Sequence, residues 1–355
     1  MILPAAIAEA DLEREFAELE ALPSLEGSLL HAVRCAALAP SSHNSQPWLF
    51  RLGEQHIDLW ADRSRALPVV DPFDRELVIS CGAALLHVRI ALQRLGWRVQ
   101  LDALPDPYTP DHLARVVVEG REEPGAETRI LYDAIPRRHT NRNPFEPRGV
   151  HPALVAELVR CANSEGSWLA PLEAQSKFEA AQLIAEADRR QFRDPHFRRE
   201  LAAWMSSEHA QRRDGLPGSA LGLGPIEAAL APLILRTFRW KDEERAAGDR
   251  ELALGSPLLV VLGTWHEEPA EWLAAGQALE HLLLAAHAAG LEASFLNQPV
   301  EVSNFRHRLR ELAGYAGFAQ LVLRMGYGPP ACATPRRRLE ELLLPATHEL
   351  ESRLP

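Results

Sequence analysis

Apolar residues at helical spacing predict a series of helices along the chain. The predicted helices span residues 6–20, 27–39, 76–95, 151–163, 173–205, 225–240 and 268–289. Pro40, Gly96 and Gly290 each follow one of these segments, and both residue types commonly end helices. The longest apolar segments therefore have clear boundaries.

Shorter apolar runs between the helices predict strands. The predicted strands span residues 49–52, 55–60, 97–104, 113–119, 256–264, 291–297 and 320–325. Gly53-Glu54 separates the first two and predicts a hairpin turn. Because helices and strands mix without a regular strand–helix–strand rhythm, the pattern favours an α+β fold.

An insertion near the middle of the chain interrupts this pattern. Residues 206–224 are rich in glycine and proline and predict a loop, which leads into the apolar helix 225–240. We interpret residues 206–250 as a lid insertion that gates a site or closes it off. The alternative interpretation is a helix for packing or dimerisation.

The chain also matches itself at two positions. At a shift of 194 residues, the segment 82–96 falls on 276–290, with Gly82/Gly276 and His87/His281 among the identical pairs. At a shift of 126, Val33-Arg34-Cys35-Ala36 falls on Val159-Arg160-Cys161-Ala162. Both matches occur in the same order, which favours duplication of one α+β unit over convergent helix composition.

Composition narrows the function classes. The chain has 355 residues, 46% hydrophobic and 25% charged, which is normal for a globular protein. Its net charge of -11 argues against nucleic-acid binding. Only two of its 38 basic residues are lysines, Lys177 and Lys241, so a phosphate site here would be built from guanidinium groups.

The expected cellular location rests on three features that we did not find in the sequence. The four cysteines are far apart and show no metal-ligand or disulfide spacing, so reduced thiols and a cytoplasmic location are expected. The acidic N-terminal segment does not resemble a signal peptide. We found no run of about 18 apolar residues and predict no membrane span.

Two polar segments are candidates for binding chemistry. Residues 39–48 (APSSHNSQPW) crowd hydroxyls and amides between two prolines, which suits a planar heteroaromatic ring but also a turn-rich connector. Residues 136–145 (PRRHTNRNPF) hold three arginines and a threonine, which suit a phosphate or form a solvated basic turn.

Two later segments add to these. Thr334-Pro335-Arg336-Arg337-Arg338 could supply a second arginine to the same anion, and Asn297-Gln298-Pro299-Val300-Glu301 follows a predicted strand. The segment 326–331 fits a dinucleotide fingerprint only formally, because its prolines precede no helix. The histidines show no ligand spacing, so we predict no metal, and we interpret His87 and His281 as core residues.

Together, PSSHNSQPW, RRHTNRNPF, the GQALEHLLLAAHAAGL helix running into FLNQPVE, and RMGYG followed by PRRRLEELL resemble the nitroreductase family of flavin enzymes. They resemble most its long, fused, Acg-like branch, over residues 28–345. Family members form an intertwined α+β dimer with FMN at the interface.

The resemblance implies which residues bind FMN. Arg138, Thr140 and Arg142 match the family's phosphate motif, and Arg336 matches its C-terminal arginine. The loop that the partner subunit supplies is matched by Ser41, Ser42 and Asn44, with Gln46 as a supporting residue. Pro299, Val300 and Glu301 resemble the segment whose backbone N–H approaches flavin N5, although Val302 stands where the family often has glycine.

The repeat and the resemblance together predict two fused, intertwined copies of the family fold, residues 1–125 and 126–355. The first half keeps the PSSHNSQPW loop and the second keeps RRHTNR, so we expect one composite FMN site in a chain that can be monomeric. No side-chain acid or base is required for hydride transfer, so no catalytic residue is predicted.

Two functions remain open. The first is an FMN oxidoreductase that passes electrons from NAD(P)H to a small-molecule substrate, a nitroaromatic or quinone-type acceptor. The second is a non-catalytic protein that binds or sequesters flavin. A different flavin chemistry, oxidative or dehalogenating, is a weaker third interpretation.

Overall fold

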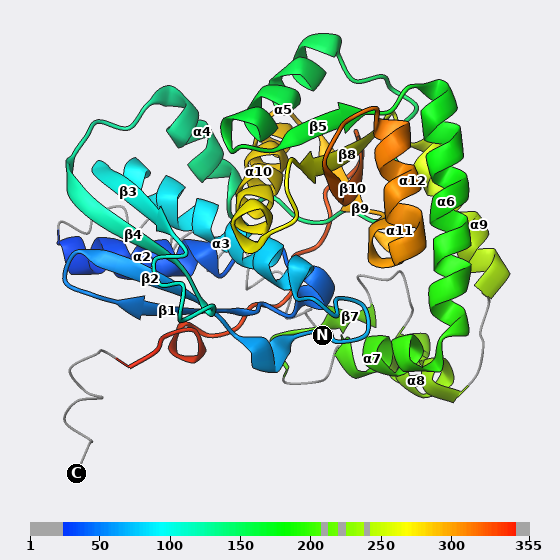
Figure 1. The fold of residues 1–355 in the computed structure, drawn as a ribbon, viewed down its shortest axis with the longest axis horizontal. Coiled ribbons are helices and arrows are strands. Elements are labelled where there is room, and N and C mark those ends of the chain that lie inside the picture. The colour runs from blue at the N-terminus through cyan, green and yellow to red at the C-terminus, as the bar shows by residue number, and fades with distance from the viewer. Residues whose placement is uncertain (1–23, 207–211, 219–224, 238–241, 346–355) are drawn as a thin grey trace, which may run out of the picture.

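The computed structural model describes residues 24–206, 212–218, 225–237 and 242–345 (Figure 1). Its helices are α2 (Leu25–Ala36), α3 (Arg75–Arg94), α4 (Ala126–Ala134), α5 (Pro152–Ser164), α6 (Ala174–Arg193), α7 (Pro195–Trp204), α8 (Pro225–Thr237), α9 (Asp242–Gly255), α10 (Pro269–Ala288), α11 (Gln298–Glu301) and α12 (Ser303–Ala313). Its strands are β1 (Trp48–Leu52), β2 (His56–Ala61), β3 (Trp97–Ala103), β4 (His112–Arg121), β5 (Trp168–Pro171), β6 (Met205–Ser206), β7 (Leu216–Pro217), β8 (Leu258–Thr264), β9 (Glu292–Phe295) and β10 (Phe318–Gly326).

Two four-stranded antiparallel sheets confirm the α+β class. The first has the order β1-β2-β4-β3 and the second β5-β8-β10-β9. In chain order, both sheets therefore place their first, second, fourth and third strands side by side. This shared topology supports the proposal of a duplicated unit. The predicted hairpin is confirmed, since Leu52 of β1 pairs with Ile57 of β2.

Helices α3 and α10 run between the two sheets and pack against each other (Figure 1). They touch at Gly82 and Gly276, a matched pair of the repeat. A Cβ atom on Gly82 would lie 2.2 Å from the carbonyl oxygen of Leu273, and one on Gly276 would lie 2.0 Å from that of Ile79. The two backbones are therefore in direct contact, which only glycine permits.

The hydrophobic cores of the two halves share residues of these helices. Ile79 of α3 is buried in the core built mainly from the second half. Leu273 and Leu284 of α10 are buried in the core around the first sheet. Because each core is completed by the other half, we propose that the halves are interlocked rather than separable domains.

The chain also crosses between the sheets at two edges. Phe50 of β1 donates its N–H to Leu342 (2.7 Å) and accepts from Leu344 (2.7 Å). Asn141 donates its N–H to Ala293 of β9 (2.8 Å). These bonds fix the C-terminal segment and the segment around Asn141 to the two sheets.

Several sequence predictions need correction. The single helix expected over 173–205 is two helices, because Pro195 begins α7 and the Asp194 carboxylate caps it by accepting the N–H of His196 (2.8 Å). Helices α4, α9 and α12 were not predicted; α9 and α12 are rich in charged residues and give little apolar periodicity. The predicted helix 6–20 lies outside the described residues.

The insertion packs onto the body of the protein. Ala231 and Leu235 of α8 are buried in a cluster with Leu201 of α7 and Leu216 of β7. Helix α9 lies along α6 (Figure 1). Packing therefore accounts for α8, which favours the packing interpretation for that helix.

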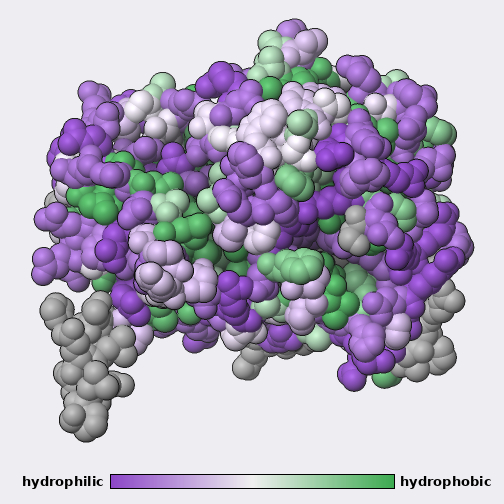
Figure 2. Space-filling view, in the orientation of Figure 1, coloured by the Kyte–Doolittle hydropathy of each residue, from purple (hydrophilic) through white to green (hydrophobic). Residues whose placement is uncertain are grey.

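One helix, α3, is long and apolar enough to cross a membrane by length and composition, contrary to the expectation from the sequence. In the structure, 89% of its apolar window is buried inside the protein. Burial of that kind is typical of a core helix. The face shown in Figure 2 is mainly hydrophilic, with scattered hydrophobic residues.

The contact between α3 and α10 makes a testable prediction. Gly82→Ala forces a methyl group against the Leu273 carbonyl, so we expect the free energy of unfolding to fall by about 1–3 kcal/mol. Urea denaturation measures this change. Gly248→Ala on α9 is the matched control, because nothing lies within 4 Å of the added atom; it should be neutral or stabilising. Equal stability of the two variants would contradict the close packing.

Candidate functional site

A cavity of about 300 Å³ collects most of the predicted site residues. Its walls come from the N-terminal part of α3, from α6 and α7, and from loops that precede or follow the sheets. The predicted residues that line it are Ser41, Ser42, Asn44, Arg138, Thr140, Arg142, Glu301 and Arg336. The remaining three, Gln46, Pro299 and Val300, are buried and do not line it.

The loop between α2 and β1 has an unusual backbone. His43, Asn44 and Gln46 have φ angles of 53°, 52° and 52°, in the left-handed region that non-glycine residues rarely adopt. Each such residue costs on the order of 1–3 kcal/mol, so the surroundings must hold the loop in place. Backbone strain of this kind is common where a loop shapes a binding site.

Gln46 and Asn44 provide that support. The Gln46 side chain donates to the carbonyl oxygen of Arg213 (2.9 Å) and accepts from the N–H of Arg337 (2.7 Å). The Asn44 amide donates to the carbonyl oxygens of Gly215 (3.1 Å) and Pro335 (3.0 Å). The prediction that Gln46 supports the loop agrees with this geometry.

The first turn of α3 borders the loop. The Ser42 hydroxyl donates to Glu76 Oε2 (2.8 Å), and Glu76 Oε1 forms an ion pair with Arg75 (2.7 Å). Arg75 in turn donates to the carbonyl oxygen of Gln320 on β10 (2.6 Å). The loop of the first half is thereby tied to the second sheet through a buried carboxylate.

Arginines form one end of the cavity. Arg138 Nε lies 3.0 Å from Glu280 Oε1, and His87 Nε2 lies 2.8 Å from the same oxygen. Arg138 and Arg336 both donate to the carbonyl oxygen of Leu38, at 3.2 and 3.1 Å. Two guanidinium groups from distant parts of the sequence are therefore held side by side.

This end is strongly electropositive. Burial and the neighbouring Arg138 lower the pKa of Arg336 to about 9. Burial and the same arginines lower the pKa of His139 to about 3, so that this histidine is neutral. Desolvation by the surrounding protein also lowers the pKa of Arg142, which lines the cavity. Such a cluster favours an anionic ligand.

Carboxyl groups also line the cavity. Burial raises the pKa of Glu301 to about 8, and the nearby Glu76 contributes to the shift. Gln191 of α6 donates to Glu301 Oε2. Burial also raises the pKa of Asp249, which accepts a hydrogen bond from Gln298 (2.7 Å). At neutral pH Glu301 is therefore mainly a neutral acid inside the cavity.

Apolar side chains complete the cavity near the insertion. Phe192 of α6 and Phe197 of α7 meet edge to face, with ring centroids 5.2 Å apart. Leu201 and Leu216 also line the wall, and Arg245 of α9 lies over the Phe192 ring at 4.2 Å. Part of the predicted lid insertion thus forms a wall of the site.

Sequence reasoning missed several of these residues. Glu76 and Ser80 lie in an apolar helix, where polar residues at buried positions were a usable signal. Asp188 and Gln191 occupy positions on the buried face of α6, where an apolar residue is expected. Polar residues at helix positions where the periodicity predicts apolar ones were therefore the sequence feature that could have identified these residues.

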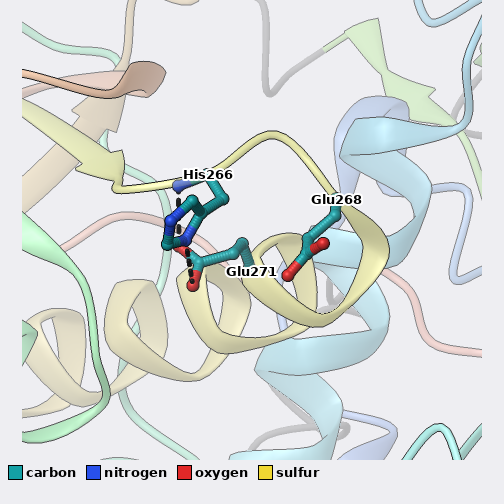
Figure 3. A group of neighbouring side chains, drawn as sticks. All are labelled: His266, Glu268 and Glu271. Carbon is teal, nitrogen blue, oxygen red and sulfur yellow. Dashed lines mark hydrogen bonds and ion pairs between the residues drawn. The ribbon is translucent and has the colours of Figure 1, made fainter.

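The four cysteines form no disulfide in the structure, and they are mostly buried as expected: Cys35, Cys81 and Cys161 are buried and Cys332 is exposed. Among the described residues, one group has metal-ligand geometry, His266, Glu268 and Glu271 (Figure 3). It lies at the surface and does not line the cavity. Glu271 Oε2 accepts hydrogen bonds from the backbone N–H groups of Trp265 and His266.

Comparisons with known proteins show the family of the chain. The model of the nitroreductase family matches residues 135–328. The Mycobacterium tuberculosis protein named "Putative NAD(P)H nitroreductase Rv3131" is 32% identical over 313 residues, which cover 87% of this chain and 88% of that protein. The chain therefore belongs to the nitroreductase family.

A second relative extends this result. The M. tuberculosis protein named "Putative NAD(P)H nitroreductase acg" is 29% identical over 317 residues, 88% of this chain and 93% of that protein. The predicted resemblance, including the Acg-like branch, is confirmed. Among solved structures, the FMN-dependent nitroreductase NfnB from Mycobacterium smegmatis in complex with NADPH is similar at 16% identity, with a TM-score of 0.39, over 60% of this chain and 96% of that one.

The raised pKa of Glu301 predicts a pH dependence of stability. Its pKa in the folded protein, about 8, exceeds the ordinary value of 4.5, so protonation favours the folded state. The stabilisation is present in full below pH 4.5 and is lost as the pH rises through 8. Glu301→Gln should therefore flatten the fall in the free energy of unfolding between pH 5 and 8, measured by urea denaturation. Glu251→Gln on the exposed side of α9 is the control and should keep the wild-type slope.

Proposed function

We propose that this chain is an FMN-dependent oxidoreductase that takes electrons from NAD(P)H and passes them to a nitroaromatic or quinone-type acceptor. The observation that carries the proposal is the convergence of two half-sites on one cavity. The polar loop with Ser41, Ser42 and Asn44 comes from the first half, and Arg138 and Arg142 come from the second.

The arginine end suits the phosphate of FMN. Arg336 Nε is buried and has no hydrogen-bond partner among the described residues. The Arg142 guanidinium makes no hydrogen bond or ion pair within that part of the chain and faces the same cavity, as does Thr140. Guanidinium donors and a hydroxyl are the groups that bind a phosphate dianion.

The residues expected to contact the flavin ring already have hydrogen-bond partners within the protein. Ser42 and Asn44 line the cavity, but their side chains already bond to Glu76 and to backbone carbonyls. The N–H groups of Val300 and Glu301 both donate to the Asn297 carbonyl oxygen, at 2.8 and 3.2 Å. The proposed approach of this backbone to flavin N5 would therefore require those bonds to be given up.

The chain's own residues would orient the reactants and supply a proton. FMN held by Arg142, Thr140 and Arg336 would supply hydride transfer from a nicotinamide and electron transfer to an acceptor. Phe192, Phe197 and Leu201 keep water away from one side of the cavity. Glu301 is mainly protonated near pH 7, and its Oε2 accepts a hydrogen bond from Gln191. That proton is available for an acceptor that gains electrons.

We further propose one FMN per chain. Eleven residues connect α2 to β1 and form the loop of the site, whereas only Glu165–Ser167 connect α5 to the equivalent strand β5. The second half thus lacks the loop that a second site would need. A single chain then holds the complete site, which is compatible with a cytoplasmic monomer.

Anaerobic mixing of the FMN-loaded protein with NADH or NADPH tests the function. We expect the flavin absorbance to bleach and to return when a quinone is added. Flavin that stays oxidised with both donors would contradict the enzyme and support the alternative, a protein that stores flavin. Two FMN per chain after reconstitution would contradict the single composite site.

Arg142→Ala should weaken FMN binding by about 1.5–3 kcal/mol, the usual contribution of a charged hydrogen bond. Fluorescence titration of the apoprotein with FMN measures the change. Arg142 is a sharper choice than Arg138, because removal of Arg138 would leave buried Glu280 without its partner. Exposed Arg308 on α12 supplies the control, Arg308→Ala, and unchanged FMN affinity in Arg142→Ala would remove this residue from the site.

A further inference from the structure

A second hollow lies beside the cavity and was not expected from the sequence. This arginine groove, with a volume of about 220 Å³, is lined by Arg212, Arg213, Asp214, Arg337, Arg338 and Glu341. Four of its six residues are therefore arginines, in a chain whose net charge is -11. Positively charged residues therefore outnumber negatively charged ones in the groove, whereas negative residues are in excess over the whole chain.

The acidic residues of the groove are already paired. Asp214 binds Arg212 (2.9 Å) and Arg65, and both arginines lower the pKa of its carboxyl, against the effect of burial. Glu341 lies 3.9 Å from Arg337, which also lies 3.5 Å from Asp62. The local carboxylates are thus neutralised by their own arginine partners.

Two arginines of the groove have no carboxylate partner among the described residues. In the part of the chain that the structure describes, the guanidinium groups of Arg213 and Arg338 make no hydrogen bond or ion pair, and both residues are exposed. Counting Arg65 and Asp62, the groove and its immediate neighbours hold five arginines and three carboxylates, a net charge of +2. Burial and the nearby Arg65 lower the pKa of Arg337, as expected where positive charge is in excess.

The groove and the cavity are lined by neighbouring residues of the same two segments. Gln46 joins these segments, with one side-chain bond to the backbone of Arg213 and one to the backbone of Arg337. Two residues beyond Asp214, Leu216 lines the cavity, and Arg336, next to Arg337, does the same. A ligand with one end in the cavity and an anionic end outside it would therefore meet the groove.

We propose that the arginine groove binds a phosphate ester of the nicotinamide donor, the adenosine 2′-phosphate that distinguishes NADPH from NADH. Planar guanidinium groups bind phosphate oxygens in pairs, and a dianion matches the two unpaired arginines. In such a dinucleotide the adenosine phosphate lies at the end opposite the nicotinamide ring. The assignment to the donor rests on the proposed function, and it predicts a preference for NADPH.

Equilibrium binding to the full-length FMN-loaded protein tests the groove without turnover. Isothermal titration calorimetry with 2′,5′-ADP, 5′-AMP and inorganic phosphate compares the possible sources of the phosphate. We expect 2′,5′-ADP to bind most tightly, and the double variant Arg213→Gln/Arg338→Gln to weaken it by tenfold or more. Arg308→Gln is the control and should bind as the wild type does. Equal binding of 2′,5′-ADP to the double variant, or equal binding of all three compounds by the wild type, would overturn the proposal.

Flavin reduction then separates this proposal from the proposed function. The double variant should lose tenfold or more in kcat/KM for NADPH, mainly through KM, and should keep the wild-type value for NADH. An equal loss with both donors would overturn the assignment to the 2′-phosphate. If neither donor reduces the flavin in the wild type, the enzyme function fails, and the calorimetric comparison still decides whether the groove binds the phosphate.

Discussion

The contact between α3 and α10 at Gly82 and Gly276 is the constraint on which the rest of the structure depends. Because neither residue has a side chain, the two backbones meet directly, and the two sheets come close enough to share their hydrophobic cores. The core exchange through Ile79 and Leu273 follows from that proximity. A larger residue at either glycine would separate the two halves of the cavity.

The same contact organises the cationic end of the site. Glu280 follows Gly276 by about one helical turn, and His87 lies at a similar distance beyond Gly82. The helix crossing therefore brings His87 and Glu280 within hydrogen-bond distance, and Glu280 holds Arg138. A buried carboxylate behind a buried arginine offsets part of its desolvation cost and fixes its direction.

The acidic side is supported by a buried polar network rather than by the helix crossing. Arg75 donates to Gln320 on β10, and Gln320 donates to Thr264 of β8 (2.7 Å) and to Glu267 (3.1 Å). Glu76 is thus fixed from behind, and its charge helps to keep Glu301 protonated. The cavity thus combines several arginines with a carboxyl group that is protonated near neutral pH, which suits an anionic ligand.

The sequence by itself determined the α+β class, the hairpin at Gly53-Glu54, the two long central helices and the family, since these depend on local periodicity and on short motifs. It also selected residues that meet at one cavity, although Arg138 and Arg336 are 198 positions apart. Only the tertiary structure showed the partners of these residues, among them Glu280 behind Arg138 and Gln191 on Glu301. The arginine groove was likewise decided by folding, because it joins two segments that charge and spacing along the chain do not connect. Local sequence patterns specify helices and strands. The pKa shifts, the strained loop and the ion pairs instead depend on atoms that are close in space and distant in sequence.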